Sequence, residues 1–330
     1  MNLSSESMSL IEYLGLDPSS VVRVIGESDW DPLEKMYLFS GKGPRSSSTH
    51  LGNYLNYKIL EWVSKRRSLP VVFQISNDQK RFDPFIPMET ARGYANDVKT
   101  VLETIPWETE FVLFENLDPG NYFLLKNYSD FLSSRVKLSR ISKLLGDLTL
   151  FQGSYLTMQL APLIHFGNGV FRGHRPLLIV ASDQVGYFLI FRDICRKLGL
   201  KRPLIIEISP LKDVLLKNKM SSESPRYAIE FSEGGLGEIV KSLSDPSGER
   251  DFCVHLSDSF LPYLEVDRAS RLRRLKSRYL ERGESLVFKS QLTSFFRELL
   301  NSTYPLKFNK LFNLDLKETI PESNYVKGLY

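Results

Sequence analysis

Residues 36–55 read MYLFSGKGPRSSSTHLGNYL, and the fold class is inferred first from these residues. Its apolar start, Met36–Phe39, is typical of a short strand, and a Gly-Lys-Gly turn follows at residues 41–43. From His50 onward the sequence opens a helix. A strand, a glycine turn and a helix N-terminus in this order can form an anion site, because backbone N–H groups and the positive end of the helix dipole face the turn. A glycine- and serine-rich surface turn before an ordinary helix would read the same way.

Downstream apolar runs predict further strands at Val71–Ile75, Phe111–Phe114, Leu177–Ser182 and Leu204–Ser209. Continuous apolar runs are expected of strands that are covered on both faces. Helical patterns lie between them, at residues 51–67, Met88–Ile105 and Tyr187–Leu198, the last one stopped by Gly199. This alternation predicts an α/β fold with a Rossmann-like, doubly wound parallel sheet and a ligand crevice at the carboxyl ends of the strands.

Two segments interrupt the alternation. The region from Tyr122 to about Gly153 reads as mostly helical and is too long for a simple crossover, which predicts a helical insertion packed on the edge of the sheet. The segment SLSDPSGE at Ser242–Glu249 is typical of a linker or exposed turn, and the sequence after it is helical. We therefore expect an N-terminal extension (1–35), a Rossmann-like domain with the crevice (36–232, insertion at about 118–160) and an all-helical domain (233–330).

A second polar segment, Asn218-Lys219-Met220-Ser221-Ser222, follows the last expected strand. Chain order would bring it across the crevice from His50. A lysine on a mobile loop at that place could neutralise charge on a leaving phosphate group, because its ammonium is a compact charge on a flexible stem. Alone, such a segment is more commonly a solvated loop. The two motifs together, at the two ends of a parallel sheet, favour a crevice that handles phosphate groups.

Composition narrows the class of protein. The chain has 330 residues, of which 42% are hydrophobic and 25% charged, as in ordinary globular proteins. Its net charge of +4 suits a polyanionic partner but does not require one. Two cysteines and four scattered histidines argue against a disulfide scaffold and a protein-built metal site. No apolar run approaches the roughly 20 residues that cross a bilayer. The acidic N-terminus argues against a targeting peptide, so we expect a cytosolic protein.

Five segments carry a resemblance to a known family: YLFSGKGPRSSSTHLGN (37–53), VVFQISNDQKRF (71–82), LTMQLAPLIHFGN (156–168), ASDQVGYFLIFRD (181–193) and NKMSSESP (218–225). They resemble class I aminoacyl-tRNA synthetases, whose signatures are an HIGH-like motif after the first strand and a KMSKS-like loop after the last. From about Tyr37 to Leu300 the chain is similar to the eukaryotic and archaeal tryptophanyl branch. The resemblance implies that the chain activates tryptophan with ATP to tryptophanyl-adenylate and then transfers it to tRNA.

The resemblance also implies roles for single residues. The residues implied in catalysis are His50, Asn53 and Lys219. Those implied in ATP binding are Gly41, Lys42, Gly43, Gly52, Asp183, Met220 and Ser221. Those implied around tryptophan are Phe39, Gln74, Gln79, Gln159 and Gln184. A neutral glutamine amide can read an indole N–H, a carboxylate or an ammonium without burying charge. Magnesium is expected with the ATP phosphates, and no metal ligand is expected from the protein.

Four residues depart from the pattern of the branch, namely Phe39, Asn53, Gln79 and Glu223. Phe39 stands where a tyrosine helps to hold the indole N–H. This leaves Gln74 as the residue expected to accept a hydrogen bond from the indole N–H. We expect the site to discriminate less strongly against phenylalanine or tyrosine. Gln79 replaces a glutamate near the substrate ammonium, a charge that the neighbouring Asp78 could supply. Asn53 replaces the second histidine of HIGH, and Glu223 replaces the last serine of the loop.

The C-terminal helices resemble the helical domain with which the family binds the anticodon. A basic helix there contains Arg271, Arg274 and Arg278, which could contact tRNA phosphates or lie free in solvent. The family also implies a homodimer. Two rival interpretations stay open: a paralogue that kept the fold but acts as a binding or regulatory module, and a tyrosine-specific ligase of the same architecture. A nucleic-acid binder without enzyme activity would leave the crevice motifs unexplained.

Overall fold

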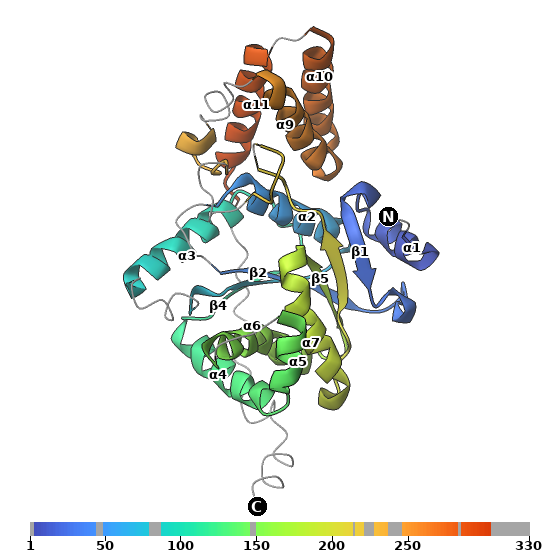
Figure 1. Ribbon diagram of the computed structural model, residues 1–330, viewed down its shortest axis with the longest axis vertical. Helices are drawn as coiled ribbons and strands as arrows, with labels where there is room; N and C mark the ends of the chain where they lie inside the picture. Colours follow the sequence, from blue (N-terminus) through green and yellow to red (C-terminus); the bar gives the residue numbers. More distant parts are fainter. Residues whose placement is uncertain are drawn as a thin grey trace, which may run out of the picture.

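The structure is a computed structural model that describes residues 3–43, 49–78, 87–145, 150–213, 215–220, 228–236, 246–282 and 285–304. Figure 1 shows a central sheet with helices on both faces and a group of C-terminal helices stacked beyond one of these helical layers. The alternating strands and helices of the sequence thus give the layered α/β architecture that was predicted.

The sheet has six strands in the order β1-β6-β5-β2-β3-β4. They are β1 (Val21–Ile25), β2 (Met36–Lys42), β3 (Val71–Ile75), β4 (Phe111–Glu115), β5 (Arg175–Val180) and β6 (Leu204–Ile208). Strands β2 to β6 are parallel to one another, which confirms the predicted parallel sheet. Strands β3, β5 and β6 are buried along their whole length, which explains their nearly continuous apolar sequences.

The first strand, β1, is not predicted by the sequence pattern. It pairs antiparallel with β6, and Arg23 of β1 forms an ion pair with Glu207 of β6. Arg23 is the exposed residue in the middle of β1, so the strand has no continuous apolar run to reveal it. Part of the predicted N-terminal extension therefore belongs to the sheet.

The order of the parallel strands creates a switch point between β2 and β5. From β2 the chain proceeds to β3 and β4 on one side, and it later returns through β5 and β6 on the other side. In an open, doubly wound sheet the ligand crevice lies at the carboxyl ends of the two strands that flank such a point. These ends are Lys42 in β2 and Val180 in β5.

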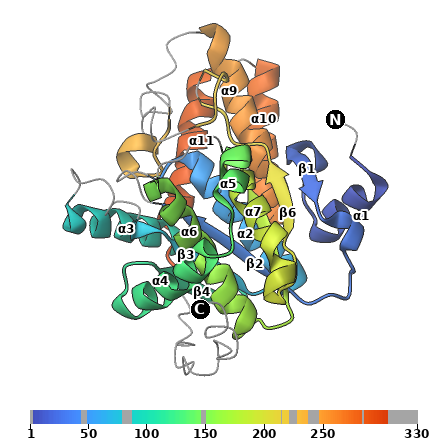
Figure 2. The same ribbon diagram turned by 60° about the horizontal axis from the view of Figure 1, so that its bottom comes forward.

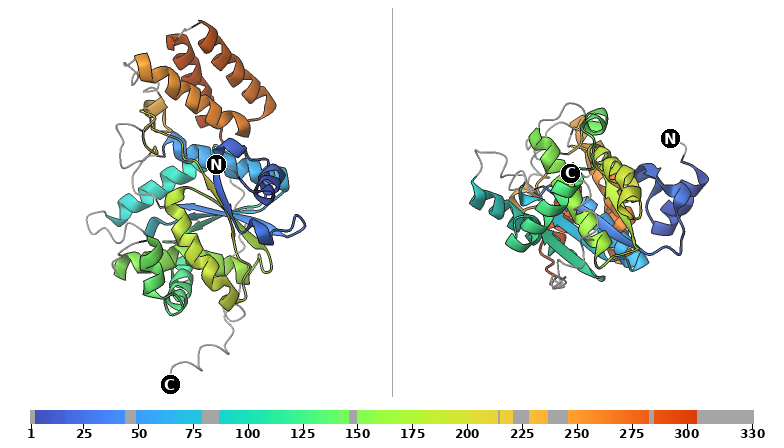
Figure 3. Two further views of the ribbon diagram at one scale, coloured as in Figure 1. Left: turned by 45° about the vertical axis from the view of Figure 1, so that its right-hand side comes forward. Right: turned by 90° about the horizontal axis from the view of Figure 1, so that it is seen from below.

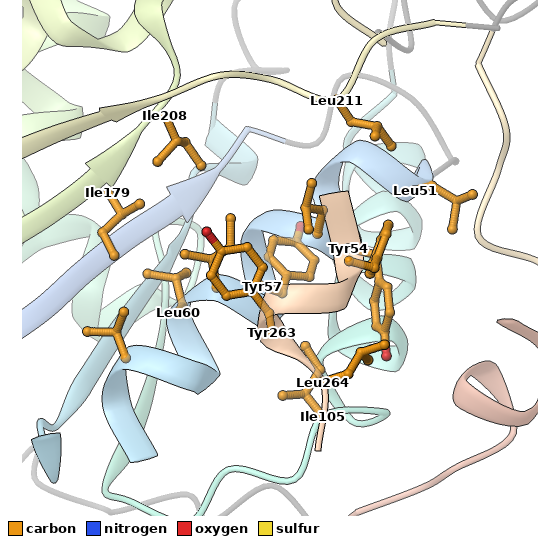
Figure 4. Packing of buried hydrophobic residues seen from close by; sticks show 14 of the residues in the cluster. Leu51, Tyr54, Tyr57, Leu60, Ile105, Ile179, Ile208, Leu211, Tyr263 and Leu264 are labelled. Atoms are coloured by element: carbon orange, nitrogen blue, oxygen red, sulfur yellow. The ribbon is translucent and has the colours of Figure 1, made fainter. Parts of the chain in front are cut away.

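One face of the sheet is covered by α1 (Ser5–Leu14), α2 (Leu51–Arg67) and α3 (Met88–Leu102). Helix α2 lies at the centre of this layer, and Figure 4 shows its Tyr54 and Tyr57 close to Ile105, Tyr263 and Leu264. The predicted helix at 51–67 is confirmed. Helix α3 ends at Leu102 and not at Ile105, because Thr104 and Ile105 donate to carbonyls three residues back in a closing turn.

The other face is covered by α4 (Pro119–Ser133), α5 (Leu138–Leu145), α6 (Leu150–Asn168) and α7 (Ser182–Leu198), as Figures 1 and 2 show. The predicted insertion corresponds to α4–α6, but its predicted position on the sheet edge is wrong. Leu156 and Leu160 of α6 share a buried cluster with Phe39 of β2 and Leu178 of β5, in the middle of the sheet. Helix α6 is apolar on nearly all sides, and such a helix has to be buried.

Helix α7 begins five residues before the predicted start at Tyr187, so that Ser182 opens a helix and does not end a strand. Its N-terminus lies directly after the carboxyl end of β5, which places the first turn of α7 at the crevice. The predicted stop is confirmed: Gly199 has a φ of 67° and its N–H bonds back to the carbonyls of Arg196 and Cys195.

The C-terminal part contains α9 (Pro246–Phe260), α10 (Val266–Arg282) and α11 (Ser285–Leu300), which Figure 3 shows stacked beyond α2. Residues 242–245 of the predicted linker lie outside the described residues, and its last residues, 246–249, open α9. Phe260 and Phe296 belong to the same buried cluster as α2. Tyr263 adds a hydrogen bond of 2.8 Å to Ser20, so apolar and polar contacts both hold this part against the rest of the chain.

Candidate active site

A cavity of about 280 Å³ lies at the switch point of the sheet. Most of the residues predicted for function line it: Phe39, Gly41, Lys42, Gly43, His50, Gly52, Asn53, Gln74, Gln159, Asp183, Gln184, Lys219 and Met220. Side chains from β2, α2, β3, α6, α7 and the segment after β6 therefore meet in one place. Ser221, Gln79 and Glu223, which were also singled out in the sequence, lie outside the described residues.

His50 lies at one end of the cavity, where it caps helix α2. Its Nδ1 accepts a hydrogen bond from the backbone N–H of Asn53 at 3.3 Å. Burial, followed by the charges of Lys42 and Lys219, lowers the pKa of His50 to about 3. The imidazole is therefore neutral at neutral pH. Because Nδ1 acts as an acceptor, the proton lies on Nε2, which makes His50 a neutral hydrogen-bond donor at a helix N-terminus.

Lys42 and Asn53 form a pair beside His50. Nζ of Lys42 donates to Oδ1 of Asn53 at 2.6 Å, so the amide nitrogen of Asn53 keeps its own donors for a ligand. Burial lowers the pKa of Lys42 to about 7, and the charge of Asp97 opposes this effect. An anion that enters this end of the cavity would favour the charged form of Lys42. This end therefore combines three donors that suit phosphate oxygens.

Two glycines at this end are required by close approaches. A Cβ atom at Gly41 would lie 2.7 Å from the carbonyl oxygen of Gln74 on the neighbouring strand. A Cβ atom at Gly52 would lie 3.0 Å from Nδ1 of His50. A side chain at Gly41 would push apart the two parallel strands, and one at Gly52 would shift the capping imidazole by a few tenths of an ångström.

Lys219 reaches the cavity from the segment that follows β6. This segment is anchored by Met220, whose side chain is buried and whose N–H donates to the carbonyl of Leu211 at 2.8 Å. Nζ of Lys219 lies 2.8 Å from Oδ1 of Asp183, in the first turn of α7. Partial burial alone would raise the pKa of Asp183, but hydrogen bonds from Lys219 and Gln184 and the charge of Lys219 lower this pKa below its ordinary value.

The three predicted glutamines and Phe39 also line the cavity. Each glutamine donates its amide nitrogen to a neighbour: Gln74 to Oδ1 of Asn116 (2.9 Å), Gln159 to the hydroxyl of Tyr155, and Gln184 to Oδ2 of Asp183 (3.3 Å). The carbonyl oxygens of these amides remain as acceptors. Phe39, together with Leu160 and Val180, supplies an apolar wall. Acceptors beside an apolar wall suit a flat apolar group that carries N–H donors.

Two residues of the site were missed in the sequence. Tyr155 lies one helical turn before Gln159 in α6, a spacing that brings side chains together and could have indicated the pair. Asn116 follows β4, and its amide bonds both to Gln74 and to Oδ1 of Asp78 (2.6 Å). Asp78 is completely buried and is not among the residues that line the cavity, and its hydrogen bond with Asn116 connects it to Gln74.

The basic helix α10 lies in the group of helices beyond α2 (Figure 1), and none of its residues lines the cavity. Arg271 is engaged by Glu298 through two hydrogen bonds of 2.5 and 2.8 Å. Arg274 and Arg278 are exposed and one helical turn apart, so they share one face of α10. Among the described residues this face offers two unneutralised guanidinium groups for a polyanion.

Within the described residues, no group of three or more His, Cys, Asp or Glu side chains is arranged to hold a metal ion. Across the same part of the chain, no helix has both the length and the apolar character that crossing a bilayer requires.

The known sequences that the chain resembles include tryptophan–tRNA ligases. No protein-family model matches the chain. The tryptophan–tRNA ligase of Encephalitozoon cuniculi is 25% identical over 206 residues, which are 60% of this chain and 52% of that protein. The tryptophan–tRNA ligase of Pyrococcus abyssi is 22% identical over 276 residues, 76% of this chain and 66% of that protein. The chain spans about half the length of the curated eukaryotic relatives that it matches.

Comparison with solved structures identifies the fold. The tryptophanyl-tRNA synthetase from Encephalitozoon cuniculi bound to tryptophan has a TM-score of 0.67 at 19% identity, covering 91% of this chain and 90% of that one. The tyrosyl-tRNA synthetase from Aeropyrum pernix has a TM-score of 0.65 at 16% identity, with 89% and 93% covered. The fold is therefore the Rossmann-like fold of class I synthetases. In sequence, the chain is similar to tryptophan–tRNA ligases at 22–25% identity.

Proposed function

We propose that the chain is a tryptophan–tRNA ligase, which activates L-tryptophan with ATP and transfers it to tRNA(Trp). One observation carries the proposal. A single cavity is lined both by groups that can donate to phosphate oxygens, His50, Lys42 and Lys219, and by the acceptor oxygens of Gln74, Gln159 and Gln184. Such a cavity can hold a nucleotide and an amino acid next to each other. Binding both molecules in one cavity holds their reacting groups close together and oriented, which speeds their reaction compared with an encounter in solution.

At the nucleotide end, the proposed role of the protein is positioning and charge stabilisation. A carboxylate oxygen of tryptophan attacks the α-phosphorus of ATP, the bond from phosphorus to the bridging oxygen breaks, and pyrophosphate leaves. The N–H of His50 and the amide of Asn53 lie where phosphate oxygens gain charge, and Lys219 neutralises the leaving group. Gly41, Gly43 and Gly52 let the chain approach the nucleotide, and Asp183 and Met220 line the same cavity. Magnesium would enter bound to the ATP phosphates.

At the amino-acid end, the proposed ligand groups are the indole ring and the ammonium of tryptophan. Phe39 supplies an apolar surface for the ring, and the glutamine carbonyls accept from the N–H groups. Phe39 has no hydroxyl, so it offers no hydrogen bond to a polar ligand atom. This supports Gln74 as the reader of the indole N–H.

The second step is proposed by analogy with the relatives. A terminal ribose hydroxyl of tRNA attacks the carbonyl of tryptophanyl-adenylate, and AMP leaves. The exposed Arg274 and Arg278 of α10, with Arg271 behind Glu298, would contact the tRNA backbone. A homodimer and the three-part domain division predicted from the sequence are part of the same proposal. So is a cytoplasmic location, which the name of the Arabidopsis thaliana relative supports.

Two other functions make different demands on the cavity. A tyrosine-specific ligase has nearly the same fold likeness, with TM-scores of 0.65 against 0.67, so the fold does not separate the two. It would need a polar reader for the phenol hydroxyl, and Phe39 is unsuited to that. A paralogue without activity would bind ATP but would have no need for the donors His50 and Lys219 together with the glutamines. Their joint presence in one cavity supports an enzyme.

The test is ATP–pyrophosphate exchange on the purified full chain with tryptophan, tyrosine or phenylalanine in turn. We expect exchange that depends on tryptophan. The control is Lys217→Ala, which removes an exposed lysine near Lys219 that does not line the cavity. Exchange with tyrosine alone would replace the proposal by the tyrosine ligase. A folded protein that binds ATP without exchange for any of the three amino acids would support the inactive paralogue.

A further inference from the structure

A chain of buried hydrogen bonds runs from the cavity into the core of the protein. Nε2 of Gln74 donates to Oδ1 of Asn116 at 2.9 Å, and Nδ2 of Asn116 donates to Oδ1 of Asp78 at 2.6 Å. Gln74 is 3% exposed, and Asn116 and Asp78 are 0% exposed. Of these three residues only Gln74 lines the cavity. The chain of bonds therefore has a carboxylate at its inner end and an amide at its outer end.

The carboxylate sets the direction of every bond in this chain. In the structure Asn116 turns its NH2 group toward Oδ1 of Asp78, and a carboxylate in its ionised form can only accept this hydrogen bond. The carbonyl oxygen of Asn116 then faces Gln74, and the NH2 group of Gln74 donates a hydrogen bond to it. Its carbonyl oxygen, Oε1, is left for the cavity, and within the described part of the chain it accepts no hydrogen bond. A flipped amide would leave two oxygens facing each other in a buried place, which is costly.

The backbone holds the three residues in this order. Gln74 lies in β3 opposite Phe114 of β4, and the N–H of Asn116 donates to the carbonyl of Ile75 at 3.0 Å. Asp78 follows the carboxyl end of β3 by three residues. The two strand ends therefore fix the spacing of the chain of bonds, and no adjustment of the cavity is needed to form it.

The same direction is repeated across the cavity. The amide nitrogen of Gln184 donates to the carboxylate of Asp183, so a carboxylate also fixes this glutamine with its carbonyl oxygen free to accept. Gln159 is paired with the hydroxyl of Tyr155, which can donate or accept and therefore sets no direction. Two of the three glutamines are thus held by carboxylates as acceptors.

We propose that Asp78 and Asn116 are positioning residues that present Gln74 to the cavity as a hydrogen-bond acceptor, and that they thereby select an amino-acid side chain with an N–H group. This rests on the proposed function, in which the ligand is tryptophan. It replaces the simpler expectation that Asp78 supplies charge directly to the substrate ammonium. Asp78 acts through two amides and determines which ligand atoms are tolerated beside Gln74.

The test uses two ligands of nearly the same shape. L-Tryptophan carries the indole N–H, and L-3-(3-benzothienyl)alanine has a sulfur atom in its place, which cannot donate. We expect the wild-type protein to prefer tryptophan in calorimetric binding. Asp78→Asn keeps the shape but removes the obligatory acceptor, so the amides can turn over. We expect tryptophan binding to weaken roughly tenfold, the factor that about 1.4 kcal/mol represents, with benzothienylalanine and ATP binding unchanged.

The matched control is Glu115→Gln, which removes a neighbouring carboxylate that pairs with Lys99 (2.5 Å) and does not line the cavity. It should leave the ligand preference unchanged. Asn116→Ala cuts the same chain of bonds in its middle, and it covers the case in which Asp78→Asn does not fold. Combining Asp78→Asn with Gln74→Leu separates a positioning role from a structural one. If Asp78 acts through Gln74, Asp78→Asn causes no further loss of tryptophan affinity in a protein that already carries Gln74→Leu.

The outcomes separate the two proposals. If the folded wild-type protein binds neither ligand, the proposed function fails and the selection of tryptophan fails with it. If the wild-type protein prefers tryptophan and Asp78→Asn and Asn116→Ala preserve that preference, the positioning role alone is overturned. An equal loss with and without Gln74 would also overturn it, because Asp78 would then act on the fold and not on this amide.

Discussion

The ammonium of Lys219 lies 2.8 Å from the carboxylate of Asp183, which links the segment after β6 to the first turn of α7 across the cavity. The two side chains are 44% and 56% exposed. An ion pair this open to water contributes at most about 1 kcal/mol. The several negative charges of a nucleotide triphosphate can therefore displace Asp183 from Lys219. The ion pair therefore holds Lys219 at the cavity and still lets it bind a nucleotide.

Replacement of this lysine should affect the chemical step. We expect Lys219→Ala to reduce the rate of tryptophanyl-adenylate formation by at least about tenfold, which corresponds to about 1.4 kcal/mol of transition-state stabilisation. ATP affinity should change less, because the charge of the leaving pyrophosphate develops mainly in the transition state. The measurement is single-turnover adenylate formation, with ATP affinity measured separately. The Lys217→Ala variant should retain the wild-type rate, and a normal rate in Lys219→Ala would refute the assigned role.

His50 should matter for stability and for the reaction in separable ways. His50→Ala removes both the cap of α2 and the donor at Nε2, so we expect at least about a tenfold loss of adenylate formation and a loss of stability of about 1 kcal/mol. His50→Asn restores a residue type that caps helices well, but its shorter amide does not reach where Nε2 lies. We expect His50→Asn to recover the stability in thermal unfolding and to leave the rate low. Recovery of both quantities together would mean that His50 acts only as a cap.

The local chemistry of the site could be predicted from the sequence because it resides in short segments. His50 and Lys219 were identified from a strand-turn-helix pattern and from a polar loop, and both line the cavity. Asn116 could not be found in this way, since an asparagine after a strand is an ordinary loop residue. Its role arises only from the pairing of β3 with β4, which brings it beside Gln74.

The elements of the fold differ in the same way in how well the sequence predicts them. Strands that are buried on both faces can be recognised in the sequence by their apolar runs, and all five predicted strands are present. The edge strand β1 escapes because Arg23 interrupts its apolar residues and pairs with Glu207, a partner that is distant in the sequence. The insertion was recognised as helical, but which surface it covers depends on the long apolar face of α6. Local pattern therefore predicts elements and motifs better than it predicts the partners of edges and insertions.

The pKa of Lys42 predicts a proton that accompanies ATP. Burial lowers this pKa to about 7, so above pH 7 the free protein increasingly carries a neutral Lys42. Phosphate oxygens favour the ammonium form, so binding above pH 7 should take up a proton, and ATP affinity should fall as the pH rises from 7 to 9. Calorimetry at pH 8 in two buffers of different ionisation heat measures this uptake. Lys42→Met should abolish it, and an unchanged uptake in Lys42→Met would assign the proton to another group.

The same shift has a consequence for stability without ligand. Lys42 has a lower pKa in the folded protein than its ordinary value of 10.5, so between pH 7 and 10.5 the unfolded chain binds more protons at this residue. The contribution of Lys42 to the free energy of unfolding should therefore increase as the pH rises through this window. Lys42→Met should flatten the pH dependence there, as measured by urea unfolding at pH 7 and pH 9. An identical pH dependence in both proteins would contradict the lowered pKa.

The arginines of α10 should contribute unequally to tRNA binding. Arg274 and Arg278 are exposed on one face, whereas Arg271 is held by Glu298 through two hydrogen bonds. Replacing Arg274 and Arg278 by alanine should weaken tRNA binding and reduce the slope of log affinity against log salt by about one unit for each lost phosphate contact. Arg271→Ala should have a smaller effect. Glu298→Gln should strengthen binding, because it removes the charge that neutralises Arg271. Arg135→Ala, an exposed arginine at the end of α4, serves as the control for a general loss of charge. Equal effects of Arg135→Ala and of the α10 substitutions would show that net charge, and not this face of α10, governs the affinity.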